Sequence, residues 1–195
     1  MNKLKTAVDI LKNGGIIISP TDTVYGLLAD ATNDLAIKKL YELKQRPLTK
    51  PFLFLVSSIE MAKEIACFSD ETERIANRFW NIEKKPLTII LKAKKVSRLS
   101  EARQETTIAI RLPNHKLLLD LINGLGNPIA APSANISGME PCRSYEAAVN
   151  TFGDKVPLII NGGTRGSIAS TIVNLSIKPY KVAREGSVTK KELSI

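Results

Sequence analysis

The segment GGIIISPTDTVYG, residues 14–26, carries the local pattern that decides the fold. Its two glycines end a predicted helix whose apolar face is formed by Leu4, Ala7, Val8 and Leu11. Three consecutive isoleucines then predict a buried strand, and the polar residues after them predict a loop at the end of that strand. The alternation of helix and strand that begins here indicates an α/β domain.

The same alternation continues along the chain. Further helices are predicted at 34–44, 58–66, 71–80, 115–123 and 145–152. Further strands are predicted at 52–56, 87–91, 107–112, 128–131, 158–160, 171–175 and 180–183. The last two strands leave no room for a crossover helix, so they are predicted to pair antiparallel. We therefore expect a single domain over residues 1–195, with a twisted mixed parallel and antiparallel sheet and flanking helices.

The composition narrows the class of protein. The chain has 195 residues and is 44% hydrophobic but only 5% aromatic, so aliphatic side chains must fill its core. It contains no run of 18 apolar residues and no apolar stretch of the kind that begins a secretory signal, so no membrane association is expected. Two separated cysteines and one histidine do not supply the ligands of a structural zinc site. A cytoplasmic location is therefore expected.

The formal net charge of +9 favours anionic partners such as nucleotides or RNA. Residues 84–103 carry seven Lys or Arg residues against one Glu. This segment is either a solvated surface or a patch that meets phosphates, and the scarcity of nearby aromatic residues does not support a base-stacking platform. The charge leaves open a non-enzymatic module that binds double-stranded RNA or tRNA.

The chain lacks several common signatures of nucleotide-binding and hydrolytic sites. It contains no G-x-G-x-x-G, G-x-x-x-x-G-K-[ST], H-E-x-x-H or G-x-S-x-G motif. Its histidine, His115, is expected to cap a helix or to lie on the surface. Polar residues gather instead at the ends of predicted strands and helices, where ligands bind in open α/β sheets. Four cations at such ends would repel one another in one cleft unless an anion lay among them: Lys44, Arg46, Arg111 and Arg184.

Several motifs resemble those of the YrdC-like threonylcarbamoyl-AMP synthases. The main ones are P-T-D-T-V-Y-G at 20–26, K-Q-R-P at 44–47 and P-S-A-N-I-S-G at 132–138. S-T-I-V at 170–173 and R-E-G at 184–186 extend the resemblance, which covers roughly residues 8–186 in the family's order. The chain looks like the short form of this family, with a single YrdC-like catalytic domain.

The resemblance implies an ATP-dependent nucleotidyl transfer. L-Threonine and bicarbonate form an N-carboxy-threonine, whose new carboxylate attacks the α-phosphate of ATP and releases pyrophosphate. The product, threonylcarbamoyl-AMP, serves the N6-threonylcarbamoyladenosine (t6A) modification of tRNA through downstream transfer proteins. Mg²⁺ would accompany ATP without a metal cage made by the protein. Direct binding of tRNA to a basic face stays open.

The resemblance also implies roles for single residues, because displacement at phosphorus needs positioning and charge neutralisation more than a nucleophilic side chain. The catalytic residues would be Lys44, Arg46, Ser133 and Asn135. ATP would be bound by Arg46, Lys50, Thr107, Ser133, Asn135 and Arg184. L-Threonine would be bound by Thr23, Leu55, Arg111, Ala131 and Ser170, with the guanidinium of Arg111 pairing its carboxylate.

Three residues depart from the common pattern of the family. Leu55 stands where some relatives carry a histidine near the threonine, Asn174 stands where aspartate is usual, and Leu28 replaces a glycine. The effect of Leu55 and Asn174 on threonine binding stays open. YrdC-like domains also occur inside carbamoyltransferases of hydrogenase maturation, but the absence of zinc-finger or acylphosphatase-like segments argues against that use of the fold.

Overall fold

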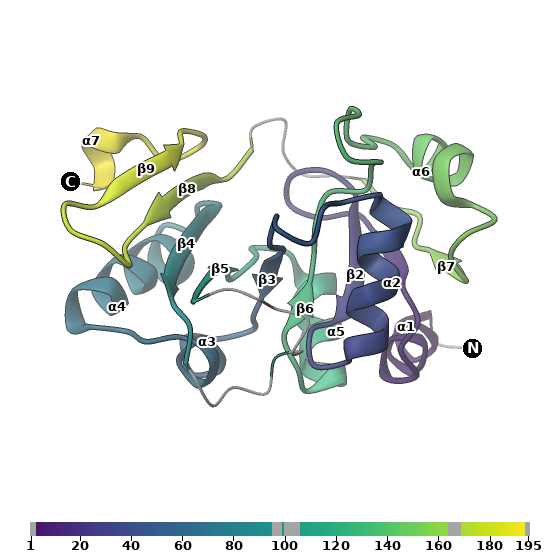
Figure 1. Cartoon of the computed structure of the whole chain (residues 1–195), viewed down its shortest axis with the longest axis horizontal. Coiled ribbons are helices and arrows are strands. Elements are labelled where there is room, and N and C mark those ends of the chain that lie inside the picture. Colours follow the sequence, from purple (N-terminus) through teal and green to yellow (C-terminus); the bar gives the residue numbers. More distant parts are fainter. Residues whose placement is uncertain (1–2, 95–98, 100–105, 164–168, 194–195) are drawn as a thin grey trace.

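The chain forms a mixed sheet with helices packed against it (Figure 1). The computed structural model describes residues 3–94, 99, 106–163 and 169–193. The strands are β1 (Ile17–Ser19), β2 (Gly26–Asp30), β3 (Leu53–Leu55), β4 (Leu87–Lys92), β5 (Thr107–Arg111), β6 (Ile129–Ala130), β7 (Leu158–Ile159), β8 (Thr171–Asn174) and β9 (Lys181–Arg184). The helices are α1 (Lys3–Lys12), α2 (Asp34–Lys44), α3 (Ile59–Ile65), α4 (Asp70–Ala76) with its π-helical continuation η1 (Asn77–Ile82), α5 (Lys116–Leu125), α6 (Tyr145–Phe152) and α7 (Lys190–Leu193).

The sheet has nine strands in the order β7-β1-β2-β6-β3-β5-β4-β8-β9. Strands β1 and β7, β3 and β5, and β4 and β8 pair parallel, whereas the other neighbouring strands pair antiparallel. The predicted mixed sheet is therefore confirmed. The predicted antiparallel pairing of the last two strands, β8 and β9, is confirmed as well. Strand β2 and helix α7 are additions that the sequence pattern does not predict.

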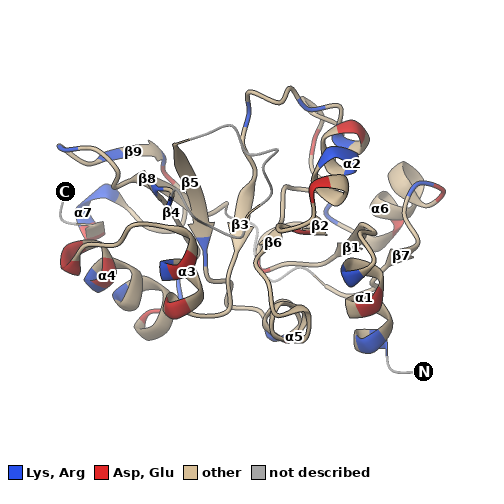
Figure 2. Ribbon diagram, turned by 60° about the horizontal axis from the view of Figure 1, so that its bottom comes forward, with Lys and Arg blue, Asp and Glu red and all other residues tan. Residues whose placement is uncertain are grey.

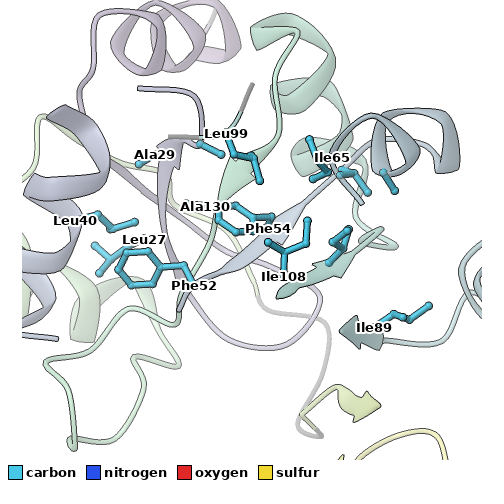
Figure 3. Close-up of a cluster of buried hydrophobic side chains, with 14 of the residues drawn as sticks. Leu27, Ala29, Leu40, Phe52, Phe54, Ile65, Ile89, Leu99, Ile108 and Ala130 are labelled. Atoms are coloured by element: carbon cyan, nitrogen blue, oxygen red, sulfur yellow. The ribbon is translucent and has the colours of Figure 1, made fainter. Parts of the chain in front are cut away.

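Two apolar clusters cover opposite faces of β1 and β2. Ile17 and Leu28 belong to the smaller cluster, together with side chains of α1 and α5. Ile18 and Leu27 belong to the larger cluster, part of which is drawn in Figure 3. Alternate side chains of a strand point to opposite faces, so a strand that is covered on both faces needs an apolar run such as 16–18. Leu28, one of the departures from the family pattern, is thus a core residue.

Helix α2 ends at Lys44, as the proline at position 47 predicts. The next residue, Gln45, has a left-handed conformation with φ 50° and ψ 46°, and its backbone N–H donates to Glu42. The backbone N–H of Arg46 donates to Tyr41 at 3.0 Å. These bonds satisfy the last carbonyl groups of the helix and reverse the chain. The reversal leaves the Lys44 side chain in the interior and sends Arg46 into the following loop.

The basic segment 84–103 is only partly within the described residues; Lys95, Arg98 and Arg103 lie outside them. Within the described part, Lys85 forms ion pairs with Glu83 and Glu192, so its charge is compensated inside the protein. Acidic and basic residues also occur together on each of α1, α2, α3 and α4 (Figure 2). None of the helices in the described part of the chain has the length and apolar character needed to span a bilayer.

Candidate active site

A cavity of about 480 Å³ opens among the loops that follow β1, α2 and β6 and the adjoining parts of β3, β4, β5 and β8. All but one of the predicted site residues line it: Thr23, Lys44, Arg46, Lys50, Leu55, Arg111, Ala131, Ser133, Asn135, Ser170 and Arg184. Segments that are far apart in the sequence therefore converge on one space. The sequence predicts a cleft where four cations at the ends of helices and strands meet, and this cleft is present: it is lined by Lys44, Arg46, Arg111 and Arg184.

Thr107 is the predicted site residue that does not line the cavity. It is the first residue of β5 and lies opposite Lys92 of β4, whereas Arg111 ends the same strand at the cavity. A strand advances about 3.3 Å per residue, which separates the backbones of Thr107 and Arg111 by roughly 13 Å. Thr107 therefore lies outside the cavity wall, and its contact with ATP stays a prediction.

The cavity wall is strongly cationic. Among the described residues that line it, one carboxylate, Asp22, faces six cations: Lys44, Arg46, Lys50, Arg111, Arg143 and Arg184. Burial lowers the pKa of Arg46 and of Arg184, and the charge of Arg111 adds to the effect on Arg184. Burial and like charges disfavour the charged form of such a cation, so an anion that binds beside it stabilises that form. The wall therefore favours a ligand with several negative charges.

Lys44 directs its ammonium group at protein acceptors. Nζ donates to the backbone oxygens of Ser133 at 2.7 Å and Asn135 at 3.0 Å, and to Oδ1 of Asn135 at 2.6 Å. An ammonium group has three hydrogens, so these bonds use all of them. Lys44 is only 2% exposed. It ties the end of α2 to the loop after β6, and its hydrogens are not presented to a ligand in this structure.

Asn135 is committed to protein partners in the same way. Its Oδ1 accepts from Lys44 and, at 2.7 Å, from the hydroxyl of Ser133. Its Nδ2 donates to the backbone oxygens of Ile136 at 2.9 Å and Met139 at 2.7 Å. A side-chain amide has two acceptor positions and two donor hydrogens, and all four are used here. Asn135 therefore shapes the loop, while the Ser133 hydroxyl can still accept a hydrogen bond.

Tyr25 joins the loop after β1 to two other loops. Its backbone N–H donates to Cys142 at 3.1 Å, and its backbone oxygen accepts from Ala134 at 2.7 Å. Its buried side chain donates a hydrogen bond from the hydroxyl to the backbone oxygen of Gly162, and the Gly162 N–H returns one at 3.2 Å. One residue thus fixes the position of three loops, of which the first two border the cavity.

Arg46 holds the loop that leads to β3. Its Nε donates to the backbone oxygen of Lys50 and its Nη2 to that of Pro51, both at 2.9 Å. Its guanidinium carbon lies 5.5 Å from the centre of the Phe52 ring, a cation–π contact. A guanidinium has five N–H donors, so Arg46 keeps donors for a ligand while it supports the loop. Lys50 is exposed at the same side of the cavity.

Arg111 is a nearly buried cation of the cavity wall. Its side chain is 4% exposed and forms an ion pair with Asp22, whose side chain is 9% exposed. Within the described structure, Nε of Arg111 is buried without a hydrogen-bond partner, whereas Nη2 contacts Oδ2 of Asp22 in the ion pair. A guanidinium can bind both oxygens of a carboxylate through two parallel N–H groups. A ligand carboxylate that reached Nε would remove the cost of about 1–3 kcal/mol that a buried unsatisfied donor carries.

Ser170 connects Arg184 to the interior of the sheet. Arg184 donates from Nε and Nη2 to the backbone oxygen of Ser170 at 3.1 and 2.8 Å, and from Nη2 to its hydroxyl at 3.1 Å. The same hydroxyl lies 3.0 Å from the hydroxyl of Thr88, which is buried and lines the cavity. The sequence does not single out Thr88 or Arg143, since a strand threonine and a loop arginine carry no motif.

The two departures from the family pattern near the predicted threonine contacts have different positions. Leu55 lies opposite Arg111 in the pairing of β3 with β5 and forms a buried apolar part of the cavity wall. Asn174 is not part of the lining. Its Oδ1 accepts from the backbone N–H of Ser176 at 2.9 Å and from its hydroxyl at 2.6 Å, which closes the turn after β8. Only Leu55 changes the surface that a ligand meets.

The Sua5_yciO_yrdC family model, described as "Telomere recombination", matches residues 9–186. The threonylcarbamoyl-AMP synthase of Pyrococcus abyssi is 37% identical over 197 residues, which cover 98% of this chain and 56% of that protein. The synthase of Enterobacter sp. is 30% identical over 168 residues, which cover 86% of this chain and 88% of that protein.

Among solved structures, P. abyssi Sua5 complexed with L-threonine has a TM-score of 0.90 and 35% identity, covering 98% of this chain and 56% of that one. The chain thus spans a little over half the length of the P. abyssi protein. The match over residues 9–186 agrees with the extent of the resemblance in the motifs. The chain belongs to the Sua5/YciO/YrdC family.

Proposed function

We propose that this protein forms threonylcarbamoyl-AMP and pyrophosphate from L-threonine, bicarbonate and ATP, as a step of the t6A modification of tRNA. The observation that carries the proposal is the cavity itself, in which Arg111 and five further cations converge. The reaction brings an amino-acid carboxylate and a triphosphate together, and such a cavity suits both anions. The names of the relatives and the threonine bound to P. abyssi Sua5 support the same reaction.

The phosphates of ATP lie, in this proposal, against Arg46 and Lys50, with Arg184 on the opposite wall. Phosphoryl transfer depends on positioning and on neutralising charge as it moves to the leaving pyrophosphate, and cations in a partly buried site perform both tasks. Lys44 and Asn135 contribute indirectly, because their mutual bonds hold the Ser133 hydroxyl at the wall.

Threonine binds at the other end of the cavity. Its carboxylate pairs with the guanidinium of Arg111, and its methyl group meets the apolar wall at Leu55. Its hydroxyl and amine lie near Thr23, the Ala131 backbone and Ser170. The carboxylate formed from bicarbonate then faces the α-phosphate, and holding both reactants in this geometry removes the entropic cost of their encounter.

ATP brings its own Mg²⁺ in this proposal. The described residues contain no group of three or more His, Cys, Asp or Glu side chains placed to hold a metal ion. Asp22, the carboxylate of the lining, is already paired with Arg111. Mg²⁺ prefers oxygen ligands and retains water, and a triphosphate supplies such ligands without a dedicated protein cage.

Pyrophosphate release by the purified protein tests the proposal. We expect release from ATP and Mg²⁺ that requires both L-threonine and bicarbonate, together with a product of the mass of threonylcarbamoyl-AMP. Release that is unchanged when either co-substrate is omitted would contradict the proposal. Asp120→Asn on α5, outside the cavity, is a control variant that should keep the full rate.

The net charge of +9 supports a second candidate function, in which the protein is a module that binds double-stranded RNA or tRNA without catalysis. That function predicts RNA affinity that falls steeply with salt and survives Arg46→Ala. Titration of RNA at two salt concentrations, with and without ATP, separates it from the synthase. In either case we expect the protein to act in the cytoplasm, where the synthase product would pass to the transfer proteins that modify tRNA.

A further inference from the structure

We propose that Asp22 binds the α-ammonium group of the amino-acid substrate and that the Asp22–Arg111 pair selects ligands carrying an ammonium beside a carboxylate. The inference deepens the proposed function and rests on it. It starts from an asymmetry of the cavity: among the described lining residues, Asp22 is the one carboxylate in a wall with six cations. A cavity built only to attract phosphates gains nothing from a buried negative charge.

The position of Asp22 fits this role. Both of its contacts in the described structure use the same oxygen: Oδ2 lies beside Nη2 of Arg111 and accepts a long hydrogen bond, 3.4 Å, from the backbone N–H of Asn114. The other oxygen, Oδ1, is therefore able to accept from a ligand. The carboxylate and guanidinium are both nearly buried, so a ligand group placed against the pair exchanges little with water.

The contact between Arg111 and Asp22 fixes where the ligand's ammonium must lie. A ligand carboxylate seated on the Arg111 guanidinium comes to rest next to Asp22, since Nη2 of that guanidinium contacts the Asp22 carboxylate. In an α-amino acid the ammonium is attached to the carbon next to the carboxylate. It therefore reaches the Asp22 carboxylate when the ligand carboxylate is seated on Arg111. A charge-assisted hydrogen bond between ammonium and carboxylate is among the strong ones in proteins.

The same arrangement repels ligands that lack the positive group. A simple carboxylate or a phosphate on Arg111 brings a second negative charge against Asp22, and two like charges in a buried site are unfavourable. Specificity built on such a repulsion rejects the wrong ligand as well as holding the right one. Asp22 thus reserves the Arg111 end of the cavity for the amino acid and directs the triphosphate toward Arg46 and Lys50.

Two ligands that differ only in the ammonium test the inference by calorimetry: L-threonine and 3-hydroxybutanoate with the same arrangement at the hydroxyl carbon. Wild type should bind threonine about 10- to 100-fold more tightly, the range expected for a charged hydrogen bond. Asp22→Asn should weaken threonine binding by a similar factor and leave 3-hydroxybutanoate unchanged or tighter. Asp22→Glu should keep part of the preference. Asp120→Asn removes the same charge from α5, outside the lining, and should alter neither affinity.

Equal weakening of both ligands in Asp22→Asn would overturn the inference, because a residue that only orients Arg111 affects every carboxylate alike. Equal binding of the two ligands by wild type would overturn it without any variant. The pyrophosphate assay separates these results from the proposed function. Threonine-dependent release with no ligand discrimination refutes the role of Asp22 alone. Asp22-dependent threonine binding without release refutes the synthase reaction and leaves the ammonium site standing.

Discussion

Lys44 is a buried cation in the wall of a cationic cavity. Burial, followed by the charge of Arg46, lowers the pKa of Lys44 from 10.5 to about 8, against a smaller opposing effect of Cys142. The folded protein therefore releases this proton at a lower pH than the unfolded chain. Below about pH 8 the residue is charged in both states, and there its charge disfavours the folded state most.

The stability of the protein should report this shift. Between about pH 8 and 10.5 the unfolded chain binds more protons at Lys44 than the folded protein, so the free energy of unfolding contributed by this residue rises with pH. Lys44→Met lacks the titrating group. Urea unfolding at several pH values should show wild type gaining stability relative to the variant across that window. If the difference in unfolding free energy between wild type and Lys44→Met stays constant with pH, the pKa of Lys44 is not lowered.

Single residues also show how much of the site can be predicted from the sequence. It predicts that Lys44 and Asn135 belong to the site, and both line the cavity. It does not predict that Lys44 donates all its hydrogens to residues 89 and 91 positions away. No local pattern encodes such partners. Thr88 and Asp22 are further examples, since their meaning depends on which side chains the sheet places opposite them.

At the scale of elements, most helices and strands lie close to their predicted ranges, and the exceptions have physical causes. The helix predicted to stop at Gly124 continues to Leu125, and Gly126 ends it with φ 77°. A Cβ on Gly124 would lie 2.9 Å from a methyl carbon of Val8. Gly124 is therefore needed for the close approach of α1 and α5. In the sequence alone, a glycine required for such packing looks the same as a glycine that ends a helix.

Strand β2 escapes sequence-based prediction for a different reason. Its five residues, Gly26–Asp30, begin with a glycine that closes the preceding loop motif, and they are all buried, so no apolar alternation marks them. They form a strand because β1 and β6 lie on either side and supply antiparallel partners. The pairing is set by neighbours distant in sequence, as is common for strands.

The end of α2 allows a test at the same scale. Gln45 occupies a left-handed conformation, φ 50°, which costs a residue with a Cβ about 1 kcal/mol relative to glycine. Gln45→Gly should therefore raise the free energy of unfolding by about 0.5–1 kcal/mol, partly offset by the freedom glycine gains in the unfolded chain. Urea unfolding measures it, with Gln45→Ala as the control that keeps the strained φ. A glycine variant no more stable than the alanine variant would argue against the left-handed cap.

At the scale of the whole molecule, the cavity exists only because separate segments meet. The loop after β1, the end of α2, the loop after β6 and the start of β8 each contribute side chains to its wall. Order along the chain is visible in the motifs, and most of the residues that the resemblance points to line one cavity. Their arrangement in space depends on the sheet order, in which β6 lies between β2 and β3.

Tyr25→Phe tests how strongly the loops depend on one another. The change removes the hydroxyl that bonds both backbone groups of Gly162. We expect the free energy of unfolding to fall by about 0.5–1.5 kcal/mol, the usual net contribution of a hydrogen bond, because Gly162 is exposed and water can replace the lost hydroxyl, and we expect weaker threonine binding. Unfolding and calorimetry measure the two effects. Tyr145→Phe on α6, outside the cavity lining, should change neither by a comparable amount.

The contacts of Tyr25 also bear on the order of events during synthesis of the chain. Its hydroxyl reaches a residue 137 positions later, so this contact closes most of the polypeptide into one loop. Closing a long loop costs conformational entropy before any contact offsets it, and such contacts slow folding. A nascent chain therefore cannot complete the Tyr25 junction until residue 162 has left the ribosome. Ligands that need that junction can bind only after nearly the whole domain has been made.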